Sequence, residues 1–416
     1  MPYQQTATQC IVRLVMLRGL HPATRAQCQA LRQEAGRLWT DLVTLHAQAR
    51  AQGQWLSASD LEQATKGGQY ALHSQSVQAL CQKLVANVDT AGELRKQERA
   101  ETGRVQSEYP YHPKVYQTVV WKDQALTVLP SGQLRLPTGG QRPPLLLPLA
   151  EEYQTVNLRR AELTWRADHY ELCLTIATGE TLPAPLPAGA VAGVDLGEAH
   201  IAAVTTTKRH ALVVSGRMLR ACKQWRNKVH STLQEQLSRC QPGSRRAKRL
   251  LKRKAQVSAK LYRQQRDLLH QAARKVVTCC QREGVSRIAV GDVRDIQTGV
   301  RLGKRTNQKI SQWPHGQFAR YLSEKAARLG ISVEWIDKSY STKTCSASSH
   351  VQSSSPRGRR FRCSGCGARI HRDVNGASNI CSKAVYGAYG QVQADQVKYL
   401  RPIGVAPRTR ATSSWR

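Results

Sequence analysis

Two aspartates stand where metal-assisted phosphodiester chemistry would need them. Asp195 ends the apolar run 191–194 and is followed by Gly197, so we expect it at the end of a buried strand that another element can approach closely. Asp373 lies far downstream, at the start of a segment with helical character. A two-ion site needs three or four carboxylates around ions that are about 3.5–4 Å apart. The two aspartates therefore predict two corners of a Mg²⁺ site.

The third corner of this site is expected at the end of the strand predicted over 287–290. The chain has Gly291 there, followed by Asp292. Because successive side chains of a strand point to opposite faces, we expect Asp292 to point away from the other two carboxylates. The sequence therefore predicts an incomplete set of acids.

A group of cysteines follows the expected sheet. Cys363 and Cys366 have the spacing of one half of a zinc ribbon, which needs a second pair upstream. That pair contains Cys345, but Ser348 occupies the partner position, and a serine hydroxyl is a poor zinc ligand. His350 would complete a set of three thiolates and one imidazole, while a collapsed ribbon without metal is the alternative. We predict weak or partial Zn²⁺ binding.

The net charge of the 416-residue chain is +35, from 63 Lys and Arg against 28 Asp and Glu. Such a surface repels itself unless a polyanion neutralises it, which favours nucleic acid as the partner. An anionic membrane is the alternative, but no apolar stretch reaches the ~18 residues of a spanning helix. The first residues lack the pattern of a signal peptide, and the twelve scattered cysteines suit a reducing compartment. We expect a cytoplasmic protein without a membrane segment.

A pair of basic helices is predicted over 217–282, with a break near Pro242. Between Arg217 and Arg266 the only acid is Glu235. A solvated helix face is the alternative, but the missing acids favour contact with phosphates. The densest cations are Arg245, Arg246, Lys248, Arg249, Lys252, Arg253 and Lys254.

The remaining patterns predict an α+β multidomain protein. Residues 20–106 have helical periodicity, and Ser59 to Glu62 matches a capping box. Residues 1–19 and 107–186 are rich in short strands, with a hairpin around Ala167 and a linker at its end. Alternating strands and helices then predict a mixed sheet with helices over 187–339 and 371–416, interrupted by a zinc-ribbon-like insert at 340–370.

Several motifs, in this order, resemble the TnpB-like proteins, which are transposon-encoded RNA-guided nucleases related to the type V CRISPR effectors. The resemblance covers nearly the whole chain. It implies an oligonucleotide-binding-like β wedge, an inserted helical recognition lobe, and an RNase H-like (RuvC-like) nuclease domain with a zinc ribbon. It also implies a guide RNA and target double-stranded DNA as partners. The motifs are 193–198, 213–217, 290–296, 302–310, 313–316, Thr344-Cys345 and 371–374.

The resemblance makes Asp195 and Asp373 the first and last catalytic acids. Relatives carry the intermediate glutamate either where this chain has Gly291 or where it has Lys338, so both positions are degenerate. Lys338 could occupy a metal position with its own charge. The remaining candidates for the third acid are Glu334, Asp292 and Asp337.

The missing third acid and the incomplete zinc ribbon both predict a loss of nuclease function. RNA-guided DNA binding requires cationic channels and shape recognition but no nuclease acids. We therefore expect an RNA-guided DNA-binding protein with impaired cleavage. An active Mg²⁺-dependent DNA endonuclease and a decayed transposon accessory protein are the alternatives.

Overall fold

The computed structural model describes residues 8–140, 142–294, 296, 303–354, 356 and 358–402. The chain forms two compact units, Met1–Thr181 and Leu182–Arg416, and their boundary lies at the start of the expected linker. Asp295 and Leu302 of the quoted motifs, and the segment 403–416 assigned to the last domain, lie outside the described residues. Within the described ranges, no helix is long and apolar enough to span a membrane.

The first unit packs three helices against two antiparallel sheets around one apolar core. The sheets have the strand orders β1-β7-β6-β2 and β3-β4-β5. The hairpin expected around Ala167 is formed by β6 and β7. The elements are β1 Thr8–Leu17, α1 Pro22–Ala51, α2 Ala58–Ala64, α3 Ser74–Thr102, β2 Val119–Lys122, β3 Thr127–Val128, β4 Gln133–Leu136, β5 Leu145–Pro148, β6 Asn157–Arg166 and β7 His169–Thr181, with short 3₁₀ turns at Asp123–Ala125 and Glu151–Tyr153.

The capping box of α2 differs from the predicted one. The backbone N–H of Asp60 donates to the Ser57 hydroxyl at 3.2 Å, and the Asp60 carboxylate accepts from the Ser57 N–H at 2.8 Å. The prediction at Ser59 to Glu62 was wrong because an aspartate three residues after Ser57 satisfies the same two backbone groups. The helix therefore begins two residues earlier.

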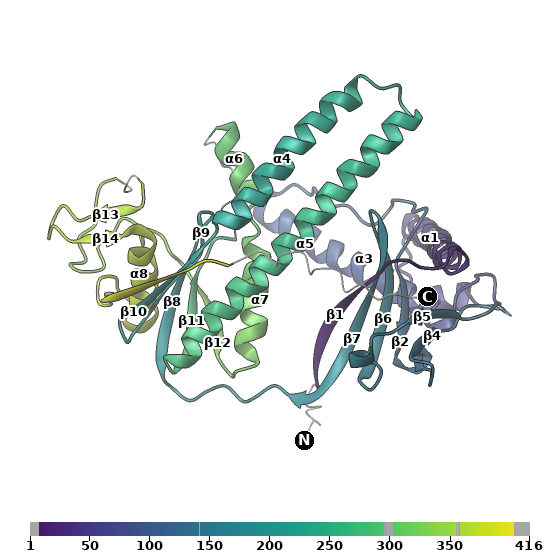
Figure 1. Ribbon diagram of the computed structural model, residues 1–416, viewed down its shortest axis with the longest axis horizontal. Helices are drawn as coiled ribbons and strands as arrows, with labels where there is room; N and C mark the ends of the chain where they lie inside the picture. The colour runs from purple at the N-terminus through teal and green to yellow at the C-terminus, as the bar shows by residue number, and fades with distance from the viewer. Residues whose placement is uncertain are drawn as a thin grey trace, which may run out of the picture. The chain divides into compact units, whose positions relative to one another are not determined.

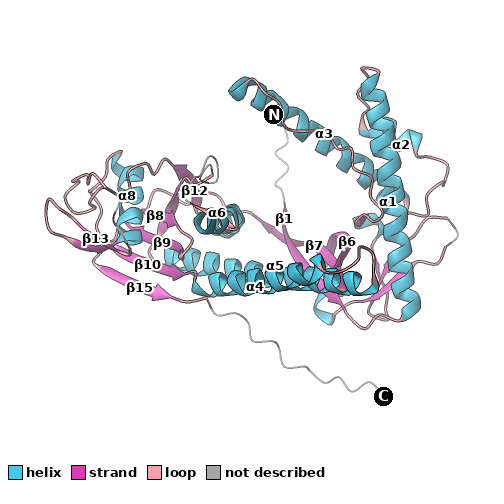
Figure 2. Ribbon diagram, turned by 90° about the horizontal axis from the view of Figure 1, so that it is seen from above, coloured by secondary structure: helices cyan, strands magenta, loops and turns pink. Residues whose placement is uncertain are grey.

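The second unit is built on a six-stranded mixed sheet of order β12-β11-β8-β9-β10-β15. Neighbouring strands are parallel at β12–β11, β11–β8 and β10–β15, and antiparallel at β8–β9 and β9–β10. Figure 2 follows this sheet from β15 at one edge to β12 at the other. The bounds are β8 Ala190–Leu196, β9 His200–Thr206, β10 His210–Ser215, β11 Val285–Gly291, β12 Ser332–Ile336 and β15 Gln396–Leu400.

Helices cover both faces of this sheet (Figure 1). Helices α5 (Arg245–Arg282) and α7 (His315–Ala327) pack on one face, and α8 (Arg372–Tyr386) packs on the other. Alternation along β8 buries Ala192 and Val194 against α5 and α7. It turns Gly193 and Asp195 toward α8, where a Cβ on Gly193 would lie 2.3 Å from the Ala377 carbonyl oxygen. Glycine at 193 therefore lets α8 approach Asp195.

Three further elements complete the second unit. Helix α4 (Arg217–Ser238) pairs with α5, as predicted for the basic pair. Helix α6 (Lys304–Ser311) was not predicted. The insert carries a short antiparallel hairpin of β13 (Arg360–Arg362) and β14 (Arg369–His371), which leads directly into α8. The mixed α+β architecture expected from the sequence is confirmed.

Candidate active site and metal centre

A lysine occupies the space beside Asp195 where the sequence analysis looked for a third acid. Lys338 follows strand β12, and its Nζ donates to Asp195 Oδ1 at 3.1 Å. The register of β11 on β8 places Gly291 next to Asp195 on the same face. A Cβ on Gly291 would lie 2.9 Å from Lys338 Cδ. Gly291 and Lys338 therefore border one space, and the lysine side chain fills it.

Burial dominates the electrostatics of Asp195. Its side chain is only 9% exposed, and burial raises its pKa above the ordinary value. The positive charge of Lys338 opposes this rise, while the negative charge of Asp373 adds to it. Lys338 is therefore the counter-ion that makes a buried carboxylate tolerable.

Asp373 lies in different surroundings, at the first turn of α8. Its Oδ2 accepts a hydrogen bond from His200 Nδ1 at 2.7 Å and one from Arg359 Nη1 at 3.0 Å. Burial raises the pKa of Asp373, but the bond from His200 and the charge of Arg359 outweigh it, and the pKa lies below its ordinary value. Neither His200 nor Arg359 was identified from the sequence.

The three alternative acids are held by basic neighbours. Arg287 binds Glu334 at 3.0 Å, Arg294 binds Asp292 through Nε at 3.0 Å, and Lys383 binds Asp337 at 3.0 Å. Each of these carboxylates is thus engaged in an ion pair of its own. The described contacts therefore do not join any of the three to Asp195 or Asp373.

The cysteines do come together. Ligand atoms of Cys345, Cys363 and Cys366 all lie within 4.8 Å of one another, with Cys345 Sγ 3.8 Å from Cys366 Sγ. Two thiolates bound at ~2.3 Å to one tetrahedral zinc are about 3.8 Å apart. Ser348 Oγ lies 3.6 Å from Cys363 Sγ, so its hydroxyl stands at the fourth corner.

His350 does not join this cluster. Its Nε2 lies 2.9 Å from the Ser364 hydroxyl, and it is outside the group of close ligand atoms formed by the three cysteines. The intervening Ser349 has a positive φ of 59°, so the backbone turns between Ser348 and His350. The expectation that His350 completes the site is not met by this geometry.

Two buried asparagines of α8 position the start of the insert. The side-chain amides of Asn375 and Asn379 donate to the Thr344 carbonyl at 2.8 and 2.7 Å. Asn379 also donates to the Ser341 carbonyl at 2.8 Å, and Asn375 Oδ1 accepts from the Ser346 N–H. These bonds satisfy backbone groups of a buried loop. They tie Cys345 to the helix that carries Asp373.

The basic helix pair presents its cations to solvent. Of the seven predicted contact residues, Lys254 is half-buried and donates to Gln234 at 2.8 Å. The other six, Arg245, Arg246, Lys248, Arg249, Lys252 and Arg253, are exposed on α5. Arg239 on the same hairpin is neutralised by Glu235 at 2.6 Å. The exposed six form a cationic surface on a rigid helix.

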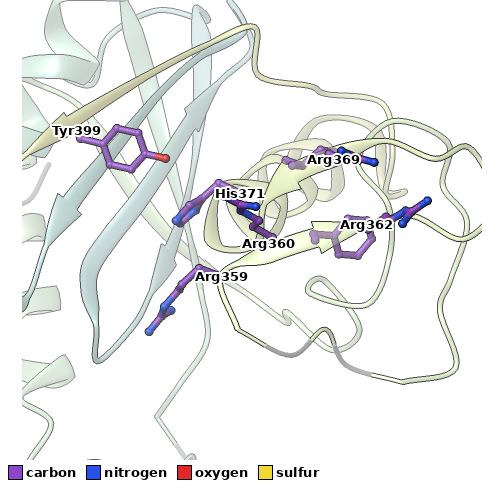
Figure 3. Close-up of a pocket in the computed structure, with 8 residues that line it drawn as sticks. Arg359, Arg360, Arg362, Arg369, His371 and Tyr399 are labelled. Atoms are coloured by element: carbon purple, nitrogen blue, oxygen red, sulfur yellow. The ribbon is translucent and has the colours of Figure 1, made fainter.

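A cavity of about 650 Å³ lies between the insert and the strand edge. Figure 3 shows His371 on its wall between Tyr399 and Arg359. Its lining carries four arginines and no acid, which suits an anionic occupant. The lining residues are Arg359, Arg360, Phe361, Arg362, Arg369, Ile370, His371 and Tyr399.

Comparison with known proteins finds two matching families and a similar relative. Residues 172–297 match the OrfB_IS605 family, described as a probable transposase, and residues 315–380 match the Cas12f1-like TNB domain. The CRISPR-associated endodeoxyribonuclease Cas12f1 of Sulfoacidibacillus thermotolerans is 29% identical over 112 residues, which is 27% of this chain and 25% of that relative. The match thus spans about a quarter of the relative's length.

The fold extends the likeness over most of the chain. The protein in the cryo-EM structure of a Cas12f1–sgRNA–target DNA complex aligns with a TM-score of 0.62 and 14% identity, covering 87% of this chain and 83% of that one. These findings define a protein with the fold of a type V effector. The two family matches and the Cas12f1 relative together support a TnpB-like family, which is related to those effectors.

Proposed function

We propose that this chain is an RNA-guided DNA-binding protein of the TnpB class whose nuclease site is impaired. Residues 1–19 and 107–186 act as the β wedge and 20–106 as the recognition lobe. Residues 187–339 and 371–416 form the RuvC-like, RNase H-like domain, and 340–370 form its zinc-ribbon-like insert. The guide RNA and the target double-stranded DNA are the proposed partners, in line with the complex formed by the similar Cas12f1 protein.

The observation that carries this proposal is the ion pair between Lys338 and Asp195. Two Mg²⁺ ions need carboxylates that converge, so that the attacking and leaving oxygens are both held. Here a cationic side chain stands between Asp195 and Gly291. The residues present do not fit a two-ion Mg²⁺ site, because the ammonium group repels an ion and supplies no lone pair.

RNA-guided DNA binding needs neither the missing third carboxylate nor the missing fourth zinc ligand. A guide–target heteroduplex is held through its backbone in a positively charged channel. The exposed cations on α5 and the arginine-lined cavity beside Asp373 supply such surfaces. Three thiolates and a serine hydroxyl would hold a Zn²⁺ weakly, which would brace the insert without entering the chemistry.

The proposal is tested by purifying the protein with its RNA and measuring guided DNA binding at several salt concentrations. Each phosphate contact contributes about −0.9 to the slope of log affinity against log salt. We expect bound RNA and a steep slope, with a triple variant Lys248→Gln, Arg249→Gln, Lys252→Gln reducing the slope by about 2–3. Arg239→Gln is the matched control, because Glu235 already neutralises that arginine. A preparation without RNA, or binding indifferent to salt, would refute the proposal.

A further inference from the structure

Three side chains gather nitrogen and oxygen donors on the Asp373 side of the site. His200 begins β9, His371 ends β14, and Asp373 stands in the first turn of α8. One ligand atom of each lies within 4.8 Å of the other two. His200 Nδ1 and Asp373 Oδ2 are 2.7 Å apart. Two ligands at ~2.0–2.1 Å around one tetrahedral ion are about 3.3 Å apart, so an ion bound here would replace the proton of this hydrogen bond and move the two atoms slightly apart.

His371 has an unused donor or acceptor atom. Its Nδ1 is buried and makes no hydrogen bond within the described part of the chain. Buried polar atoms are normally satisfied, so such an atom needs an explanation. A neutral imidazole carries the lone pair that a metal ion requires. The ring lines the solvent-connected cavity of Figure 3, which offers an entry path.

We propose that His200, His371 and Asp373 form a binding site for one divalent transition-metal cation such as Mn²⁺, Co²⁺ or Zn²⁺. Imidazole nitrogens favour these ions over Mg²⁺, which prefers oxygen ligands. Its three residues do not include Asp195 or Lys338, which pair with each other. The inference goes beyond the proposed function, because it needs neither a guide RNA nor cleavage.

The guanidinium group of Arg359 competes with this cation for the Asp373 carboxylate. Its Nη1 lies 3.0 Å from Asp373 Oδ2 and 3.3 Å from Oδ1. The side chain is 48% exposed, so the guanidinium can retain Oδ1 while an ion binds Oδ2. Its charge must still weaken cation binding. Arg359→Gln is therefore expected to raise the affinity for the ion.

The test uses Mn²⁺ with the full-length protein in an excess of Mg²⁺. Mn²⁺ binds thiolates poorly, so the cysteine cluster does not contribute to the signal. Its paramagnetism reports free and bound ion by electron paramagnetic resonance, and the pulsed form of the measurement detects coupling to imidazole ¹⁴N. We expect one bound Mn²⁺ with nitrogen coupling in the wild type and tighter binding in Arg359→Gln.

The variants separate a metal site from a hydrogen-bonded network. His200→Ala and His371→Ala are each expected to weaken Mn²⁺ binding at least about tenfold, and the double variant to lose nitrogen coupling. Asp373→Asn, which keeps the side-chain shape, should also weaken it. His210→Ala is the matched control, because His210 pairs with Glu283 at 2.6 Å on the same sheet. Circular dichroism verifies folding. Bound Mn²⁺ without nitrogen coupling, or equal affinity in wild type and Asp373→Asn, would overturn the proposal.

Discussion

The carboxylate site and the thiol site of the second unit each lack one metal ligand, and a different kind of side chain stands in its place in each. In the carboxylate site, Lys338 places a positive charge against Asp195. In the thiol site, Ser348 places a neutral hydroxyl near Cys363. A cation in a metal position opposes the ion directly, whereas a hydroxyl only withholds a good donor. We infer that the first replacement abolishes its site and the second weakens it.

The largest effect is expected from Lys338→Met, which leaves Asp195 buried without a counter-ion. Breaking a buried pair costs about 3–5 kcal/mol, and the partial exposure of Lys338 reduces this to about 2–3 kcal/mol at neutral pH. Because burial raises the pKa of Asp195 in the folded state, protonation relieves the cost, and the loss should shrink as pH falls. Denaturant unfolding at several pH values measures it.

The control for this variant is Lys383→Met. Lys383 binds the exposed Asp337, and an exposed pair contributes about 0–1 kcal/mol. Lys338→Met could lower the free energy of unfolding no more than Lys383→Met does, or by an amount that does not change with pH. Either result would contradict the assignment of Lys338 as the counter-ion.

Ser348→Cys should convert the thiol cluster into a four-cysteine zinc site. The Ser348 oxygen already stands at the fourth corner, so a thiolate there is expected to raise Zn²⁺ affinity by at least about tenfold. Competition with a chelator of known affinity provides the measurement. Ser349→Cys is the matched control, since that side chain bonds to the Tyr389 carbonyl instead. Equal affinities for the two variants would show that the fourth corner lies elsewhere.

Arg359→Gln is expected to have a smaller effect on stability, below about 1 kcal/mol, because Arg359 is 48% exposed and His200 still donates to Asp373. The pKa of Asp373 is lowered in the folded state. Its stabilising contribution is therefore fully present above its unfolded pKa near 4 and is lost as pH falls further. The stabilities of wild type and variant should converge in acid. A difference that grows on acidification would contradict this electrostatic account.

The smallest effect is expected from His350→Ala. Because His350 Nε2 lies 2.9 Å from the Ser364 hydroxyl and is not among the ligand atoms that lie within 4.8 Å of one another, the Zn²⁺ content should remain unchanged. Metal analysis of the purified variant decides this, and loss of zinc would show that the imidazole is the fourth ligand after all.

Local patterns predicted the parts of the fold that bury continuous apolar surface. Strand β8 has an unbroken buried run, whereas β15 has four exposed residues and is recognisable only by its pairing with β10. The basic pair α4 and α5 was predicted because its periodicity and charge are both local. Short, solvated elements such as α6 carry too little apolar pattern to be recognised.

Site residues in local motifs were likewise predicted, whereas those that depend on distant contacts were not. Asp195 and Asp373 stand in motifs and were predicted from the residues as corners of a metal site. His200 was missed because its contact with Asp373 joins positions 173 residues apart. His350 was preferred to Ser348 on ligand chemistry, but the backbone turn at Ser349 decides which side chain faces the thiols. The ligand chemistry of a residue type does not predict where its side chain points when the backbone turns.

We propose that Lys338 occupies a metal position and that the chain binds DNA without cutting it. The most direct test measures guide-directed cleavage of target DNA in Mg²⁺ by the wild type and by Asp195→Ala, side by side with Lys338→Glu. We predict guided binding by all three, and wild-type cleavage no greater than that of Asp195→Ala. Robust wild-type cutting that Asp195→Ala abolishes would contradict the account and would make Glu334, Asp292 and Asp337 the acids to substitute next.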